Sequence, residues 1–279
     1  MRLLFAVLLL IQPSDDITRA RDWIISQQNE DGGWSDGLSE RSGPGITVDA
    51  LIALENADRA SVEYLHDFAN QNATVLHPTL AAKLTMAAVM LGEDPRNFAG
   101  VDLVGIMLTT DSAQFSDSIF EHCLVMIAAY HADADTPPDA LAYLDNEQDE
   151  GGGWGFFVDA PPDSNTTAMC IQAKIAQNDT DVTGALDFLR ELQNDDAGWT
   201  FQKPSDFSTA TDAYSTALVI MALNAAEQDL ADWGHPEERL LEFQRADGAF
   251  GSEDDPLPLF ATTAAIPALA NRSLLDIQL

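Results

Sequence analysis

A seven-residue motif recurs four times along the chain and constrains its fold more than any other feature. Each copy begins with Gln, continues through acidic or other polar residues, and ends with Gly or Ala followed by an aromatic side chain. The copies span residues 28–34, 148–154, 193–199 and 244–250. The last three recur about every 45 to 50 residues, at the upper end of the periods of helical repeat proteins. The motif therefore predicts an array of similar helical units.

Each copy of the motif lies between two different helical patterns. Upstream, apolar residues return at three- and four-residue steps, which predicts amphipathic helices around residues 140–144, 185–189 and 240–243. Downstream, the segments are apolar all round and rich in Ala and Thr, which predicts helices buried on both sides. These downstream segments are residues 47–54, 166–171, 216–220 and 262–266. The Gly residues allow a tight reversal, the aromatic can fill the gap between hairpins, and the Gln amide can bond open backbone groups at the helix end.

Two further units lack the motif but repeat the pattern of helices. Apolar helices are predicted to open at residues 77–84 and 117–124, each after an amphipathic segment, at 61–71 and 101–109. Six such pairs give about twelve helices, enough to close into a ring with the apolar helices inside. We therefore predict an all-α fold, a single α/α toroid of about six helix hairpins spanning residues 15–279. Pro267 is expected to kink the last inner helix or to mark its end.

The charge balance excludes one class of partner. The 279 residues include 46 acidic and 13 basic side chains, a formal net charge of −33. No basic stripe exists to displace phosphate counterions, so no nucleic-acid partner is expected. Because the acids are scattered and lack a calcium-loop spacing, they favour a halophile-like solvated surface over an acidic cation-binding surface.

The N-terminus and the cysteines give weaker signals. Residues 1–14 hold one arginine and an apolar run, which is typical of a short signal peptide and also of an apolar segment packed on the ring. We expect a secreted or cell-surface protein, or otherwise a cytoplasmic one. Cys123 and Cys170 form neither a disulfide framework nor a metal-ligand cluster, and both are expected to be free thiols buried in apolar helices.

The Gln-to-aromatic motifs resemble the repeats of squalene–hopene cyclases and of the related prenyltransferases. The order of the parts is also similar to bacterial surface proteins related to the transcobalamin and intrinsic-factor toroids, on the segments 92–103, 163–168 and 264–269. The resemblance covers nearly the whole chain beyond about residue 18. It implies a ring whose cavity binds a hydrophobic small molecule, isoprenoid or corrinoid, and an association with a membrane surface or cell surface. It is specific for fold and much less so for activity.

Departures from these families bear on catalysis. In the cyclases, an Asp-rich run supplies a neutral carboxyl that protonates the substrate. The matching run here is residues 163–168, and Asn165 stands where the proton donor should be; a second run at 212–217 lacks the acid too. Prenyltransferases hold zinc with Asp, Cys and His, but neither cysteine lies in an Asp-x-Cys pair and His122 adjoins Cys123. No metal and no cofactor is therefore predicted.

Polar side chains near the N-terminal ends of the inner helices are the candidates for a ligand cavity. They are Asp49, His77, Asp117, Glu121, His122, Asp163, Asn165, Asp212 and Tyr214. Helix N-termini favour anions, so a carboxylate or phosphate ligand fits this position. The alternative is that Asp117, Asp163, Asn165 and Ser215 are ordinary helix caps and that His122 is a salt-linked structural residue. The motif tryptophans are expected to pack between hairpins.

Three functions remain open at this stage. The first is a non-catalytic toroid that binds a hydrophobic or amphipathic small molecule, or a partner, in its cavity or on its rim. The second is a terpenoid-handling enzyme with an acid outside the usual motif, and the third is a glycan-processing enzyme with a pair of carboxylates. Two acids across an open cavity would indicate the glycan-processing enzyme. One buried acid among aromatic side chains would indicate the terpenoid-handling enzyme. A narrow or filled centre would leave the non-catalytic toroid.

Overall fold

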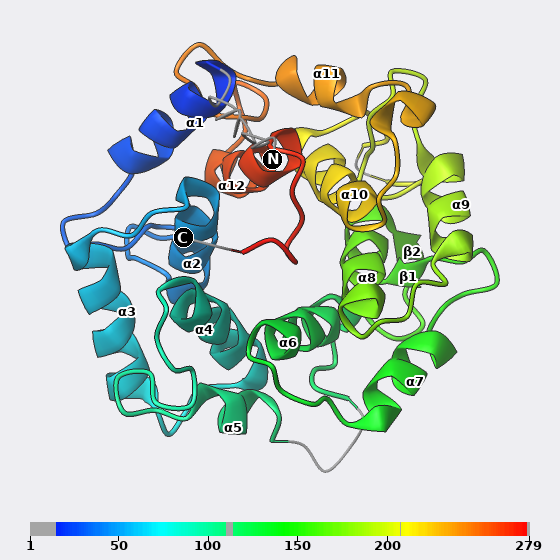
Figure 1. Cartoon of the computed structure of the whole chain (residues 1–279). Coiled ribbons are helices and arrows are strands. Elements are labelled where there is room, and N and C mark those ends of the chain that lie inside the picture. Colours follow the sequence, from blue (N-terminus) through cyan, green and yellow to red (C-terminus); the bar gives the residue numbers. More distant parts are fainter. Residues whose placement is uncertain (1–14, 110–113, 207, 278–279) are drawn as a thin grey trace, which may run out of the picture.

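The chain forms a closed ring of paired helices, as the repeats predict (Figure 1). The computed structural model describes residues 15–109, 114–206 and 208–277, so the predicted apolar segment at 1–14 lies outside the described residues. Twelve α-helices alternate between an outer and an inner layer in this part of the chain. The outer helices are α1 (Asp15–Ser26), α3 (Arg59–Asn72), α5 (Leu103–Met107), α7 (Pro138–Asn146), α9 (Thr183–Leu192) and α11 (Pro236–Leu241).

The inner layer carries most of the buried apolar surface. Its helices are α2 (Pro44–Leu54), α4 (Pro78–Met90), α6 (Ile119–His131), α8 (Ser164–Ala176), α10 (Ala213–Ala225) and α12 (Pro258–Leu269). Each inner helix packs on its two inner neighbours, and α12 packs on α2 to close the ring. Most inner-helix residues are buried, because each inner helix packs on two inner neighbours and on the outer layer. The predicted α/α toroid of six hairpins is thus confirmed.

The motif tryptophans link three inner helices, α2, α8 and α10, to the outer helices that precede them. The indole Nε1 of Trp34, Trp154 and Trp199 donates to a carbonyl oxygen ten residues upstream in the outer helix, at 2.7 Å in all three copies. The backbone N–H of the same tryptophan donates to a threonine Oγ1 on the following inner helix, at 3.0 to 3.1 Å. All three indoles are at most 2% exposed. The prediction that these tryptophans pack between helices is confirmed.

The motif glutamines fasten the loop and, in three copies, the next hairpin. Each Gln Nε2 donates to the carbonyl oxygen four residues downstream, in the loop and not at the helix end. Gln193 also donates to the carbonyl of Trp233 at 2.8 Å, and Gln28 donates to Asp58 at 3.3 Å. Gln244 donates to the carbonyl of Asp16 at 2.7 Å, which ties the last repeat to α1 and helps to close the ring.

Two details differ from the pattern read in the sequence, whereas Pro267 follows it by marking the end of the last inner helix. The amphipathic segment at 101–109 gives only the five-residue helix α5, because a bridge between Phe98 and Val101 takes up its start. Pro267 lies inside α12, which ends two residues later at Leu269, so it marks the last turn. Strands β1 (Trp154–Gly155) and β2 (Pro162–Asp163) form a short antiparallel hairpin in the loop before α8.

The segment after α12 turns inward and crosses one end of the ring (Figure 1). His131 Nε2 lies 2.7 Å from the carbonyl oxygen of Leu274, and Gln172 Oε1 accepts from the Leu274 N–H at 2.8 Å. Asn224 donates to the carbonyl of Arg272 at 3.0 Å. These anchors come from the later turns of α6, α8 and α10, so the tail covers the C-terminal ends of the inner helices. No described helix has the length and apolarity that a bilayer crossing requires.

Candidate functional site

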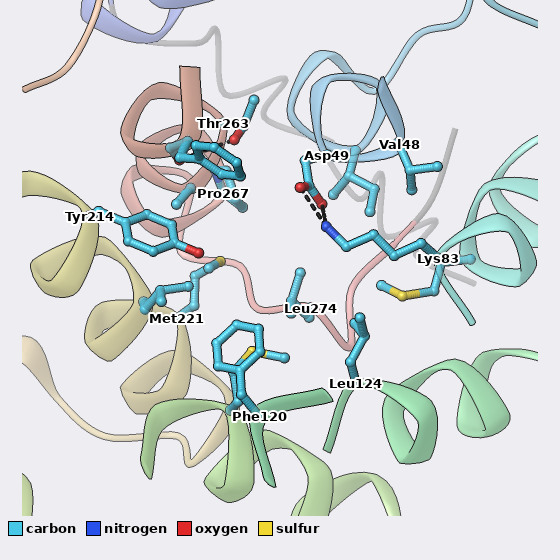
Figure 2. A pocket seen from close by; sticks show the side chains of 16 residues that line it. Val48, Asp49, Lys83, Phe120, Leu124, Tyr214, Met221, Thr263, Pro267 and Leu274 are labelled. Carbon is cyan, nitrogen blue, oxygen red and sulfur yellow. Dashed lines mark hydrogen bonds and ion pairs between the residues drawn. The ribbon is translucent and has the colours of Figure 1, made fainter. Parts of the chain in front are cut away.

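The lumen of the ring contains an apolar cavity of about 180 Å³ (Figure 2). All six inner helices contribute to its wall, and Leu274 of the tail lies at its floor. The apolar lining residues are Val48, Ile52, Met86, Phe120, Leu124, Met169, Leu218, Met221, Phe260, Ala264, Pro267 and Leu274. The inner helices are apolar on every side, so the face turned to the lumen is apolar as well.

One ion pair interrupts the apolar wall. Lys83 Nζ of α4 lies 2.6 Å from Oδ1 and 2.5 Å from Oδ2 of Asp49 on α2, and both side chains point into the lumen (Figure 2). About a quarter of each side chain stays exposed. An ammonium group carries three donors, and Asp49 takes up two of them. The pair therefore offers one N–H and the remaining carboxylate lone pairs to a ligand.

An aromatic group stands across the cavity from this pair. Tyr214, near the start of α10, directs its hydroxyl into the lumen (Figure 2), and its ring packs edge-on against Phe260 at 6.2 Å between centroids. Burial raises the pKa of the Tyr214 phenol, and the negative charges of Asp49 and Asp212 raise it further. The phenol is therefore a neutral donor and acceptor at physiological pH.

Different described residues line the two ends of the cavity. Leu274 lies at the C-terminal ends of the inner helices, whereas Phe120, Tyr214 and Phe260 each fall within the first three residues of their helices. The aromatic side chains therefore line the mouth, and the tail forms the floor. The loops that lead into α2, α8 and α10 carry exposed apolar side chains at this end, namely Leu38, Phe157, Val158 and Phe201.

Glu121 and His122 do not line the cavity, although they adjoin Phe120. Glu121 accepts from Thr79 Oγ1 at 3.0 Å and from Ser116 Oγ at 2.6 Å, which links α6 to α4. His122 is buried and points to the outer layer, where Nε2 donates to the carbonyl of Ala140 at 3.1 Å and Nδ1 accepts from the N–H of Phe115 at 3.3 Å. Burial lowers the pKa of His122 to about 4. It is a neutral structural histidine held by backbone groups and is not salt-linked.

Asp163 and Asp212 are helix caps. Asp163 accepts from the N–H of Thr166 at 2.7 Å at the start of α8, and Asp212 accepts from the N–H of Ser215 at 2.7 Å at the start of α10. Burial raises the pKa of Asp163 to about 7 and raises the pKa of Asp212 as well. Asn165, beside Asp163, accepts from Ser164 Oγ at 3.1 Å. None of the three lines the central cavity.

The last two candidates lie at the surface. His77 precedes α4 and is exposed, with no capping bond from its side chain. Asp117 is exposed, and the neighbouring Ser118 caps α6 in its place by accepting from the N–H of Glu121. Of the nine candidates, the structure thus brings only Asp49 and Tyr214 to the cavity.

The sequence analysis did not predict Lys83, the aromatic residues Phe120 and Phe260, or the tail residue Leu274 as parts of the cavity wall. Lys83 had a detectable signal, because it is a lone cation in an Ala-rich apolar helix next to the helix that carries Asp49. The tail around Leu274 had no such sequence signal, because it lies outside the repeated helix pattern. Within the described part of the chain, no three His, Cys, Asp or Glu side chains are grouped as metal ligands.

The fold is shared with proteins of different activities. The type II terpene cyclase MstE from Scytonema has a similar structure, with a TM-score of 0.67 and 14% sequence identity. The match covers 92% of this chain and 96% of the cyclase chain. Haptocorrin in complex with Cbi is similar over 94% of this chain and 68% of its own, with a TM-score of 0.64 and 12% identity. A wild-type glycosidase is similar over 94% and 100%, with a TM-score of 0.64 and 12% identity. Neither a family model nor a curated protein matches the sequence.

These similarities are at the level of the fold alone. A cyclase, a corrinoid-binding protein and a glycosidase each have the α/α toroid, so the ring itself selects none of the three activities. The side chains that line the cavity, and not the fold, therefore distinguish between these functions.

Proposed function

We propose that the protein binds a small amphipathic molecule in its central cavity and does not transform it. The observation that carries the proposal is the lining, whose described residues are apolar except for the Asp49–Lys83 pair, the Tyr214 hydroxyl and Thr263. Such a wall suits a ligand with a hydrocarbon body and one polar group. The body contacts Leu218, Met221 and Met169, and the polar group bonds Lys83 or Tyr214.

The volume narrows the class of ligand. A dry cavity of about 150 Å³ accommodates benzene, so about 180 Å³ suits a single ring or a short isoprenoid. A corrinoid macrocycle is far larger and would have to rest on the rim among Leu38, Phe157 and Phe201. The hydrophobic small-molecule ligand expected from the sequence therefore remains the better proposal, in its isoprenoid form.

The described lining of the central cavity lacks a residue that each catalytic alternative requires. Among the described residues, Asp49 is the one carboxylate that lines the central cavity, whereas glycoside hydrolysis uses two carboxylates on opposite sides of the bond. Cyclisation requires a protonated acid at the substrate, but both oxygens of Asp49 accept hydrogen bonds from an ammonium group. Asn165 also stands in place of the usual acid, and it lies outside the cavity.

Titration of the protein with geraniol and with benzyl alcohol tests the proposal. We expect one molecule bound per chain by calorimetry, and a rise in Tm of about 5 °C near saturation, because the ligand binds only the folded state. Leu218→Trp fills the lumen and is expected to abolish both effects. Leu141→Trp makes the same change on outer helix α7 and is expected to leave binding unchanged.

The polar end of the site is tested separately. Replacing the whole pair in a double variant, Asp49→Leu with Lys83→Met, avoids leaving one charge unpaired in an apolar wall. We expect geraniol affinity to fall about tenfold, the value of a lost hydrogen bond, while a terpene hydrocarbon binds as before. Absence of binding to the native protein, or equal binding to Leu218→Trp, would contradict the proposed function.

A further inference from the structure

The two cysteines, far apart in sequence, meet behind the wall of the cavity. Cys123 lies on α6 and Cys170 on α8, two neighbouring inner helices (Figure 1), and their Sγ atoms are 2.7 Å apart. Both residues are fully buried. Non-bonded sulfur atoms in simple contact stay further apart than this, whereas a disulfide brings them to about 2.05 Å. The fold therefore holds the pair already close to bonding distance.

We propose that Cys123 and Cys170 are a modification site at which a reversible disulfide joins α6 to α8. The chain contains only these two cysteines, so each has a single intramolecular partner. Leu124 and Met169, their immediate neighbours in sequence, line the cavity. The bond therefore fastens together the two helices that form this side of the wall. The disulfide proposal does not depend on which ligand the cavity binds.

The oxidant is a small-molecule disulfide, and the exchange is balanced. The first protein thiol attacks the oxidised glutathione disulfide and releases one reduced glutathione; the second protein thiol then attacks the mixed disulfide and releases the other. Two protein S–H bonds and one glutathione S–S bond are lost, and one protein S–S bond and two glutathione S–H bonds are formed. The protein sulfurs lose two electrons, which the glutathione sulfurs gain.

The surroundings of the pair determine how fast it reacts. Burial raises the pKa of the Cys170 thiol well above its usual range, and the adjacent Cys123 sulfur adds to the effect. Since the thiolate is the attacking species, exchange in the folded ring is slow and proceeds when the chain folds or opens locally. The same burial protects the bond once it has formed.

Refolding the reduced protein in a glutathione buffer of fixed composition tests the site. After free thiols are blocked, mass spectrometry measures the fraction of chains that are two hydrogens lighter and carry no blocking group. We expect the ratio of disulfide to dithiol to be at least about 100-fold higher in native buffer than in guanidinium chloride, because the fold holds the sulfurs together. Equal or lower ratios in native buffer, or chains that carry only glutathione adducts, would overturn the proposal.

A second readout measures the effect on the ring. Oxidation should raise the Tm of the native protein by about 5 to 10 °C, since the bond closes a loop of nearly fifty residues in the unfolded chain. Cys170→Ser gives the control, because the same treatment cannot cross-link it and its Tm should not change. If the Tm of the oxidised native protein is equal to or lower than that of the reduced protein, the proposal that the folded ring accommodates this disulfide is wrong.

Discussion

At the scale of the residue, burial decides what each polar side chain does. His122 is a candidate site residue because it is titratable in an otherwise apolar helix, and Asp163 because it lies at the N-terminal end of an inner helix. The structure places each against backbone donors or acceptors and away from the lumen. Asp49 and Tyr214 reach the cavity, but a helix that is apolar all round has no polar face by which to predict which residues meet the lumen.

His122 is expected to make the protein less stable in acid. Its pKa is about 4 when folded and 6.5 in the reference state, so between these values the unfolded chain binds a proton that the folded chain rejects. Its contribution to stability is therefore complete above pH 6.5 and falls by about 1.4 kcal/mol per pH unit toward pH 4. Denaturant unfolding from pH 7.5 to 4.5 measures the free energy of unfolding, which should fall less steeply with decreasing pH in His122→Gln than in the native protein. Equal pH dependence in the two proteins would contradict this role of His122.

Asp163 contributes in the opposite direction. Its pKa is raised from 3.8 to about 7, so the folded state holds a proton that the unfolded chain releases, and stability falls as the pH rises from 4 to 7. Asp163→Asn preserves the cap without a charge. Relative to the native protein, we expect this variant to gain about 1 to 3 kcal/mol at pH 8 and nothing at pH 4, by the same unfolding measurement. A constant difference across this range would show that the carboxyl stays ionised.

At the scale of the element, the hairpin motif was predictable because each copy repeats the same bonds. The sequence marks the Gln and Trp positions, and the three copies that contain Trp use them alike. The units without the motif were harder to place. The helix α5 is much shorter than its apolar pattern indicated, because tertiary contacts around Phe98 and Val101 override a weak local period.

The motif glycine makes a specific prediction about packing between hairpins. Gly152 has a φ of +90°, and a Cβ placed there would lie 2.3 Å from the carbonyl oxygen of Gly184 at the start of α9. We expect Gly152→Ala to lower the free energy of unfolding by about 2 to 4 kcal/mol, from backbone strain and the clash together.

Gly92 is the matched control for this change. Its φ is also positive, at +69°, but nothing lies within 4 Å of the added Cβ. Gly92→Ala should therefore lower the free energy of unfolding by only about 1 kcal/mol, because it introduces backbone strain without a clash. Urea unfolding of both variants measures the difference, and equal costs would mean that the close approach of the hairpins contributes nothing.

At the scale of the whole molecule, the ring was predictable and its interior was not. The count of hairpins and the apolar inner layer follow from the repeats. The depth of the cavity depends on the tail that closes it, and that tail is held by scattered bonds from His131, Gln172 and Asn224. Single side chains on three different helices leave no periodic trace in a sequence.

The acidic surface predicts a response to salt. A net charge of −33 on 279 residues repels itself in the compact state, and salt screens that repulsion. We expect the Tm to rise by several degrees between about 0.05 and 1 M NaCl, over which the Debye length falls to about 3 Å. A Tm that stays flat or falls over this series would contradict a surface adapted to salt.

The central claim is that the lumen is a binding site for a small amphiphile. The most direct test is a crystal structure of the protein soaked with 4-bromobenzyl alcohol, with the bromine located by its anomalous scattering. We expect one ordered bromine within the cavity, among Leu218, Met221 and Met169, with the hydroxyl bonded to Lys83 or Tyr214. A cavity without bromine density, or bromine found only on the outer surface of the ring, would contradict it.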